Sequence, residues 1–506
     1  MSGDKIMGWS IKSLYKGTYL YLGLPLFIFL LSWLDYEVAT ILAPIFAFAF
    51  YKLWQNIGKD NKKCLSMPMI WWALGVAAIW CFFAGIGYFY YQSWDYHFRN
   101  AVFRDLISYD WPVFYRLANT PFVYYMGFWL IPALIGKLAM FMGANLATAI
   151  YIGNIFLFIY AAIGLALIFL HIAVAVNAKN YKKLLSAAFI FMFFSGADII
   201  GYLFFQEMEQ PFAYHLDWWA SFMQYSSMAT GMFWVFNQFI MTGLILFLIY
   251  NEQSVKSFGF LMPIALFYAP YPTATLGILA VIVAISQWLK AKNKEEFFWQ
   301  NIFSIPNILA VFWILPVVVL YFMTNTEGMD KLWYVFDFTT PSRLLLFMIL
   351  EFLLYAAVLW QAYHKELFFK AAVILLILIP FFRIDQQNNF CMRASMPALM
   401  LISLFTVKFL LELSESKKLT LNNILLIILF LIGSATPVTE FYRGLHYTFE
   451  AGKINLVKDE IYTLNQPFVR MPEFGWSANH QYTAQNYRTD IFWHWLAHRN
   501  IPDTYF

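Results

Sequence analysis

Charged residues are scarce in this chain: Asp, Glu, Lys and Arg together make up only 12% of its 506 residues. A water-soluble domain carries about a quarter charged residues, so this chain has too little polar surface to cover itself in water. Hydrophobic residues make up 61%, which is enough apolar length for more than about ten helices of about 20 residues each. The sequence therefore predicts an all-α protein that crosses a membrane many times.

Cysteine is also nearly absent. Cys64, Cys81 and Cys391 form no CxxC pair, so neither a disulfide framework nor a zinc site follows from them. A strong excess of one charge is lacking as well, because the net charge is only +4. The basic residues cluster in short loops, where they report membrane topology rather than a nucleic-acid partner.

Short basic loops predict which side of the membrane each loop occupies, because Lys and Arg prefer the cytoplasm. We expect about 13 to 15 spanning helices, some of them short and broken. Residues 146–176 fit either two short helices or one long tilted helix. Residues 258–289 are interrupted by Pro270 and Pro272 and fit a broken hairpin. Other spans are expected near residues 18–34, 37–54, 69–91, 121–142, 184–205, 231–250, 306–322, 342–362, 368–382, 392–413 and 419–437.

This topology predicts a transmembrane domain over residues 1–440, whose first outer loop is 92–120, and a small extracytoplasmic segment over 441–506. The N-terminal apolar stretch is read as a retained helix rather than a cleaved signal peptide. All the loops rich in Asp, Glu, His, Arg and Asn fall on the outer face. Any chemistry is therefore expected outside the cytoplasm.

The first outer loop predicts an amphipathic helix lying at the membrane surface, because Phe98, Val102 and Leu106 form an apolar stripe at a spacing of four. Asp95 stands just before this stripe, where a helix N-cap belongs. Asp105 falls near the apolar stripe, so its carboxylate must be paired, neutralised or turned into a wet cavity. Arg99 has the spacing to pair with Asp95.

The same loop resembles a known family. Its segment Asp95-Tyr96-His97-Phe98-Arg99-Asn100 is similar to the D-[YF]-x-x-H/R-N-W stretches of lipid-linked oligosaccharide glucosyltransferases, and an acidic residue there is a hallmark of the GT-C membrane glycosyltransferases. Residues 124–133, 222–227 and 388–398 resemble uncharacterised bacterial members. The similarity covers most of the transmembrane region in patches. The adjacent Asp-Asp or Asp-Glu pair of several branches is missing, so the donor sugar is left open.

This resemblance implies a transferase of the bacterial inner membrane, with its active site facing outward. The donor would be a sugar on a polyprenyl phosphate, and the acceptor a glycan, a lipid or a protein, with no nucleic acid involved. Asp95 is the first choice for the base that takes the acceptor proton, and Asp105 is the second. The groups expected to bind the donor phosphate or the substrate are His97, Arg99, His215, Lys331, Arg383 and Arg393.

A cofactor is not indicated by the residues themselves. The resemblance allows a divalent cation, Mg²⁺ or Mn²⁺, held by Asp95 together with Glu207, Glu209, His215 and Asp217 of the second outer loop. The alternation of these two glutamates beside one histidine is weak evidence for a metal site.

Three other functions compete with the transferase. A flippase or transporter would place charges inside spans and carry internal repeats, whereas here only Lys137, Asp198 and Glu351 interrupt the spans and no inverted repeat is found. An O-antigen ligase or polymerase would put its large loop between late spans. A non-catalytic membrane scaffold is the remaining alternative.

Overall fold

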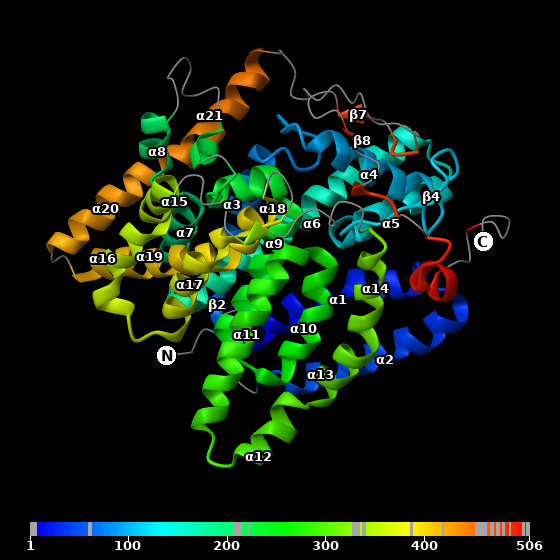
Figure 1. Ribbon diagram of the computed structural model, residues 1–506, viewed down its shortest axis with the longest axis horizontal. Coiled ribbons are helices and arrows are strands. Elements are labelled where there is room, and N and C mark those ends of the chain that lie inside the picture. Colours follow the sequence, from blue (N-terminus) through cyan, green and yellow to red (C-terminus); the bar gives the residue numbers. More distant parts are fainter. Residues whose placement is uncertain are drawn as a thin grey trace, which may run out of the picture.

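The computed structural model of the chain is built almost entirely of helices (Figure 1). Helices α10 to α14, drawn in green, occupy the lower part of the view, and α16, α17, α19 and α20 lie to the left. The residues that the structure describes are 8–58, 63–205, 215–220, 222–325, 334–335, 341–384, 388–416, 419–450, 463–465, 470–471, 476–477, 481–484, 487–497 and 501.

Within these residues, nine helices are long and apolar enough to cross a membrane, and four shorter apolar helices of 10–17 residues accompany them. Nine and four make thirteen, the lower end of the expected number. The predicted class is confirmed: the protein is an all-α, polytopic integral membrane protein.

The helices of the first half differ widely in length. They are α1 (Ile11–Ser32), α2 (Tyr36–Asn56), α3 (Met67–Phe83), α4 (Tyr96–Ser108), α5 (Gly127–Phe141), α6 (Leu146–Ala175), α7 (Tyr181–Met192), α8 (Asp198–Phe205), the 3-10 helix η1 (Leu216–Ala220) and α9 (Met228–Glu252).

The second half contains several helices interrupted by π-helical or 3-10 turns. Its helical elements are α10 (Val255–Tyr268), α11 (Pro270–Lys290), α12 (Lys294–Phe297), η2 (Phe298–Ile302), α13 (Ile305–Leu309), η3 (Ala310–Ile314), α14 (Leu315–Met323), α15 (Pro341–Met348), η4 (Ile349–Leu353), α16 (Leu354–Tyr363), α17 (Leu367–Leu378), η5 (Ile379–Phe381), α18 (Asn389–Ala394), α19 (Met396–Ser416), α20 (Leu421–Gly433), α21 (Ala435–Glu450) and η7 (Phe492–Leu496).

The described strands are short and form four antiparallel pairs. They are β1 (Gly8–Ser10) with β2 (Lys63–Ser66), β3 (Phe114–Tyr115) with β4 (Thr120–Pro121), β5 (Tyr334–Val335) with β6 (Phe382–Arg383), and β7 (Arg470–Met471) with β8 (Trp476–Ser477).

Of the two alternatives for residues 146–176, the structure has the single long helix. At 1.5 Å per residue, the 30 residues of α6 extend about 45 Å. Its first half lies against α4, since Gly153 faces Phe103. Its last turns reach the start of α1, where His171 hydrogen-bonds Thr18 at 2.9 Å. The expected span at 121–142 is wrong in its length, because the 15 residues of α5 cover only about 22 Å of a roughly 30 Å core.

The broken hairpin expected at 258–289 is confirmed. Ala269 leaves helical geometry, with φ −154° and ψ 81°, between the end of α10 and the start of α11. The two helices return to the same side, where the Gln287 side chain donates to the Gln253 carbonyl at 2.8 Å. Proline at the start of α11 costs no helical hydrogen bond, because the first N–H groups of a helix have no partner within it.

The expected span at 184–205 is two helices rather than one. The chain leaves helical geometry between Met192 and Asp198, so α7 and α8 are separated by a short turn that contains Gly196. This turn needs glycine because a Cβ atom at Gly196 would lie 2.3 Å from the Glu351 carboxylate. The break therefore brings Asp198 and Glu351 together from two different helices.

Helix α9 is the centre of the bundle, since nearly all of its apolar window is buried by α6, α10, α19 and α21. Residues near the C-terminus close over residues 92–120 at one end of the bundle, which we call the outer end because the distribution of basic residues predicts that it faces outward. The Val123 N–H donates to the Tyr482 carbonyl at 2.9 Å, and the Leu464 N–H donates to Asp105 at 2.8 Å. Helix α21 continues the span of α20 as far as Glu450, past the expected boundary at residue 440.

The topology can be tested with single cysteines at exposed positions. Cysteine in place of Arg116 or Glu450 should react with a membrane-impermeant thiol reagent on intact cells, and cysteine in place of Lys292 or Lys365 should not.

The native cysteines should not react with the reagent, because Cys81 and Cys391 are buried. Cys64 is replaced by serine in every variant. Labelling at Lys292 and Lys365 together with silence at Arg116 and Glu450 would invert the topology.

Candidate functional site

Asp95 immediately precedes α4, but its side chain does not cap the helix. Its backbone is helical, with φ −57° and ψ −23°, and within the described residues its side chain makes no capping hydrogen bond. The carboxylate instead accepts a hydrogen bond from the Arg99 guanidinium at 2.9 Å, one turn further along the helix. Asp95 thus occupies the expected N-cap position without capping the helix through its side chain, and the predicted pairing of Asp95 with Arg99 is confirmed.

Arg99 is held firmly against the core. Its guanidinium lies 5.4 Å from the centroid of the Tyr96 ring and 6.0 Å from that of Phe236. The side chain of Arg99 is 6% exposed, whereas that of Asp95 is 35% exposed. Arg99 therefore holds one oxygen of the Asp95 carboxylate by a hydrogen bond, and the carboxylate remains accessible to a ligand.

The loop that carries Asp95 is turned back toward the bundle at Gly85, whose φ is +75°. A Cβ atom there would lie 2.3 Å from the Tyr91 carbonyl oxygen, so only glycine fits. The Tyr96 hydroxyl then donates to the Ala84 carbonyl at 2.8 Å and anchors the first turn of α4 to the end of α3. These local contacts place Asp95 at the outer end of the helices.

Arg393 reaches the same place from the other half of the chain. It lies on α18, which Asn388 caps by accepting the Cys391 N–H at 3.3 Å. The Thr275 hydroxyl of α11 donates to the Ala394 carbonyl at 2.6 Å and fixes α18 against α11. Arg393 lies within electrostatic reach of Asp95.

Four tyrosines surround this pair of charges. Tyr124, Tyr125 and Tyr271 act electrostatically on Arg393, and Tyr482 is influenced by Asp95, Arg99 and Arg393 together. The rings also touch one another, with centroids 3.7 Å apart for Tyr124 and Tyr125 and 4.7 Å apart for Tyr124 and Tyr482. We call this group the Asp95–Arg393 site; its members are Asp95, Arg99, Tyr124, Tyr125, Tyr271, Arg393 and Tyr482.

The Asp95–Arg393 site has the elements needed to bind a phosphorylated, partly apolar ligand. Among the described residues, the Arg393 Nε has no hydrogen-bond partner although it is shielded from solvent, and Nη1 of Arg99 is in the same condition. An unpaired guanidinium N–H is costly to bury and is satisfied by an anion. Aromatic rings supply flat apolar surface beside these donors.

His97 and Arg383, two of the other expected ligands, have their own surroundings. The His97 ring packs edge-on against Trp94, with centroids 6.3 Å apart. The Arg383 guanidinium lies over the Phe222 ring, 4.5 Å from its centroid. Lys331, Glu207 and Glu209 lie outside the described residues.

Asp105 lies at the far end of α4, about 15 Å along the helix from Asp95. Its carboxylate is buried, accepts the Leu464 N–H at 2.8 Å and pairs with Arg104 at 3.1 Å. Burial raises the pKa of Asp105 to about 6, although the Leu464 hydrogen bond opposes this. These contacts make Asp105 a tie between the first outer loop and the C-terminal segment.

His215 belongs to a second, buried group at the outer end of the bundle. Its Nδ1 lies 2.6 Å from the Glu440 carboxylate, which also accepts from Arg443 at 3.0 Å and from the Trp234 ring N–H at 3.1 Å. Burial alone would lower the pKa of His215, but the Glu440 carboxylate outweighs burial and raises it.

Sequence reasoning missed Glu440 and Arg443. Their spacing of three on a helix is a signal for an ion pair, but it could be recognised only if α21 had been predicted to continue the preceding span.

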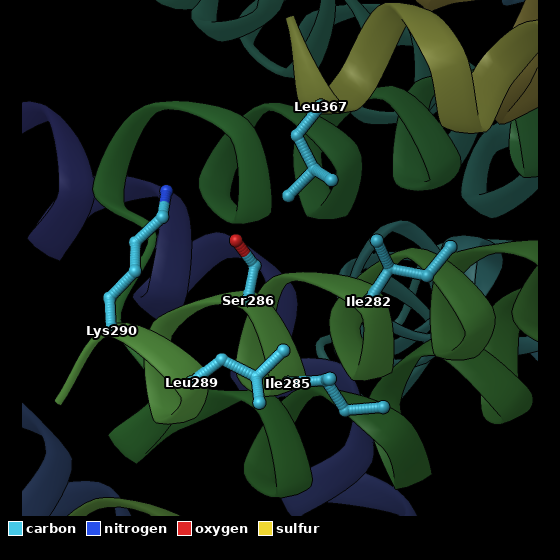
Figure 2. Close-up of a pocket in the computed structure, with 6 residues that line it drawn as sticks. All are labelled: Ile282, Ile285, Ser286, Leu289, Lys290 and Leu367. Atoms are coloured by element: carbon cyan, nitrogen blue, oxygen red, sulfur yellow. The ribbon is translucent and has the colours of Figure 1, made fainter.

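Within the described ranges, no group of three His, Cys, Asp or Glu side chains is placed to hold a metal ion. An apolar groove of about 400 Å³ lies elsewhere, along the last turns of α11, where Ile282, Ser286 and Lys290 face Leu367 of α17 (Figure 2). It is far along α11 from Tyr271, so it is separate from the Asp95–Arg393 site.

Comparison with known proteins gives no assignment: no protein-family model, no curated protein and no solved structure matches this chain.

The role of Asp105 as a tie can be tested by stability. Asp105→Ala leaves the Leu464 N–H unpaired and should lower the free energy of unfolding by about 1–3 kcal/mol, whereas Asp105→Asn keeps an acceptor and should cost less. Thermal unfolding in detergent measures both.

The pH dependence of the free energy of unfolding provides a second test of this role. Since the folded pKa of about 6 lies above the ordinary value of 3.8, the contribution of Asp105 to stability is complete below about pH 3.8 and is lost as the pH rises through about 6. Asp105→Asn should lack this loss. If both substitutions destabilise the protein equally and leave the pH dependence of its stability unchanged, Asp105 does not link the first outer loop to the C-terminal segment.

Proposed function

We propose that the protein is a glycosyltransferase of the GT-C type, which transfers a sugar from a polyprenyl-phosphate donor to an acceptor hydroxyl at the outer face of a bacterial inner membrane. The observation that carries the proposal is that a partly exposed carboxylate, Asp95, lies within electrostatic reach of Arg393, beside tyrosine rings at the outer end of the bundle. These two residues are almost 300 positions apart in the sequence.

In this mechanism Asp95 is the general base. As the acceptor oxygen forms its bond to the anomeric carbon of the sugar, its proton passes to the free oxygen of Asp95. The bond between the anomeric carbon and the phosphate oxygen breaks, and its electron pair leaves with the phosphate. A single displacement of this kind inverts the configuration at the anomeric carbon.

Arg393 is the group that stabilises the leaving phosphate. Negative charge grows on the phosphate as the glycosidic bond to it breaks, and a guanidinium placed beforehand stabilises that charge more than it stabilises the ground state. A planar fork with several N–H donors matches phosphate oxygens better than a lysine ammonium does. The lipid tail of the donor would remain among the apolar helices.

Arg99 has a positioning role. Its hydrogen bond to one oxygen of Asp95 sets the orientation of the carboxylate. The aromatic rings of Tyr124, Tyr125 and Tyr482 would pack on the sugar face. This chemistry requires no redox cofactor, and a divalent cation would be an addition to it.

A transporter or flippase is the second candidate, because Asp198 and Glu351 are buried carboxyls in or beside the spans and such groups mark proton and ion pathways in transporters. The two functions differ in what they need. Transfer of a sugar proceeds in detergent, whereas transport requires a sealed membrane with two compartments.

The base is tested by Asp95→Asn. Asparagine can still accept the Arg99 hydrogen bond but cannot take a proton, so turnover should fall by at least about 100-fold while the protein remains folded. The assay mixes purified protein with polyprenyl-linked sugars and candidate acceptors in detergent. Asp105→Asn is the matched control on the same helix and should keep most of its activity. Near-wild-type turnover of Asp95→Asn would remove Asp95 from the mechanism.

The phosphate contact is tested by Arg393. Because a charge-assisted hydrogen bond contributes about 1.5–3 kcal/mol, Arg393→Ala should lower kcat/KM by roughly 10- to 100-fold, and Arg393→Lys by less. The exposed Arg488, which lies over Tyr487, provides the control, and Arg488→Ala should be silent. If a broad panel of donors gives no transfer while vesicles show translocation of lipid that depends on Arg393, the transferase proposal is wrong.

A further inference from the structure

A group of carboxyls lies buried at the outer end of the bundle, apart from the Asp95–Arg393 site. Asp198 begins α8, Asp217 lies on η1 and Glu351 lies on the π-helical turn η4. All three side chains are almost completely buried. We call Asp198, Asp217 and Glu351 the acidic cluster. The proposed transferase chemistry does not use it.

Two members of the cluster face each other. One Asp198 oxygen accepts from the Ser195 hydroxyl at 2.6 Å and from the Thr436 hydroxyl at 2.7 Å. One Glu351 oxygen accepts from the Trp219 ring N–H at 2.8 Å. The Glu351 carboxyl also lies within hydrogen-bonding reach of the Asp198 carboxyl. Two carboxylates are both acceptors, so they can bond only if one of them carries a proton.

Most of the remaining oxygens of the cluster have no donor. Among the described residues, both oxygens of Asp217, Oδ1 of Asp198 and Oε2 of Glu351 are buried without a hydrogen-bond partner. The Thr230 hydroxyl faces Asp217 and also lies 2.8 Å from the Ser227 hydroxyl, and either of these two hydroxyls can be the donor between them. A buried ionised carboxylate without donors is costly and becomes neutral instead.

Nearby charges do not compensate the cluster. His215 Nε2 lies 3.8 Å from Asp217, but its Nδ1 is paired with Glu440. Arg443 also pairs with Glu440. Counting Glu440, four carboxylates face one arginine and at most one protonated histidine, which leaves two negative charges without a counter-charge.

Other elements that pack here add no cation in the described contacts. Tyr355 of α16 is influenced by Asp198 and Glu351, and Trp219 and Trp234 contribute ring N–H groups. Arg343 of α15 lies over the Phe205 ring, 4.5 Å from its centroid.

The backbone around the cluster is adapted to it. Gly196 lets Glu351 approach the turn between α7 and α8, since a Cβ atom there would collide with the carboxylate. Glu351 lies on a π-helical turn, a distortion that is frequent at functional sites. A Cβ atom at Gly196 would also lie 2.7 Å from the Cα atom of Glu351, so glycine lets the two backbones approach as well.

We propose that Asp198, Asp217 and Glu351 form a proton-binding site at the outer end of the bundle, in which bound protons replace the missing counter-charges and hold α8, η1 and η4 together. The ligand is the proton because the described carboxyls are not arranged to hold a metal ion. Burial raises the pKa of Asp217 to about 8, and the negative charge of Asp198 adds to this effect.

The site makes the outer end of the bundle stable in acid and weaker in alkali. The folded pKa of Asp217 lies above the ordinary value of 3.8. Its contribution to stability is therefore complete below about pH 3.8 and is lost as the pH rises through about 8. External pH would thereby control the packing of η1, which leads directly to α9.

Infrared spectroscopy of the purified full-length protein in detergent tests this proposal, because a protonated carboxyl has a C=O stretch that shifts in heavy water. The wild type should show this band at pH 6 and lose intensity as the pH rises through about 8. Asp217→Asn should remove the intensity of a single carboxyl and flatten the dependence of Tm on pH over that range. Glu37→Gln, which changes an exposed carboxyl, should leave both unchanged.

The proposal fails if the wild type shows no protonated carboxyl at pH 6, and this result does not depend on any variant. It also fails if Mg²⁺ or Ca²⁺ raises the Tm of the wild type but not of Asp217→Asn, because the site would then hold a metal ion. If Asp217→Asn does not fold, Glu351→Gln replaces it and should likewise remove the intensity of a single carboxyl. Neither measurement involves sugar transfer, so failure here leaves the proposed function untouched.

Discussion

The lack of water in the bilayer core is the constraint on which this structure depends. Every backbone N–H and C=O group there must be paired within the protein, which permits helices and tolerates breaks only where neighbouring protein covers them. The break at Ala269 is covered in this way, since Tyr268 and Phe267 pack against Gly127. Polar side chains are consequently concentrated where spans end, as at the Asp95–Arg393 site, whereas Glu351 of the acidic cluster lies within the span Pro341–Tyr363.

Helix packing brings together parts of the chain that are far apart in the sequence. The start of α4 and the six-residue α18 come within electrostatic reach of each other, because α11 holds α18 through Thr275 and the end of α3 holds α4 through Tyr96. Residues near the C-terminus then cover the first outer loop through Leu464 and Tyr482. The Asp95–Arg393 site thus depends on helices from both halves of the chain and on the outer segment.

Composition and periodicity were enough to predict the membrane class, the broken hairpin at α10 and α11, and the pairing of Asp95 with Arg99. These features depend on local sequence, namely apolar length, proline position and a spacing of four. The break between α7 and α8 was missed because residues 184–205 are apolar enough for one span, and only the approach of Glu351 to Gly196 reveals why they are not. Glu440 was missed for the same reason, since its partners His215 and Trp234 are distant in sequence, and Asp217 was considered only as a possible metal ligand.

The central claim is that Asp95 and Arg393 share one site for a polyprenyl-linked phosphate. The most direct measurement is photo-crosslinking of the purified protein with a polyprenyl phosphate that carries a photoreactive group next to the phosphate, followed by mapping of the labelled peptides. The account predicts labelling of the segments around Tyr124, Tyr271 and Phe390, which is prevented by unlabelled polyprenyl phosphate and reduced in Arg393→Ala. Labelling confined to other segments, such as the apolar groove along the last turns of α11, would contradict it.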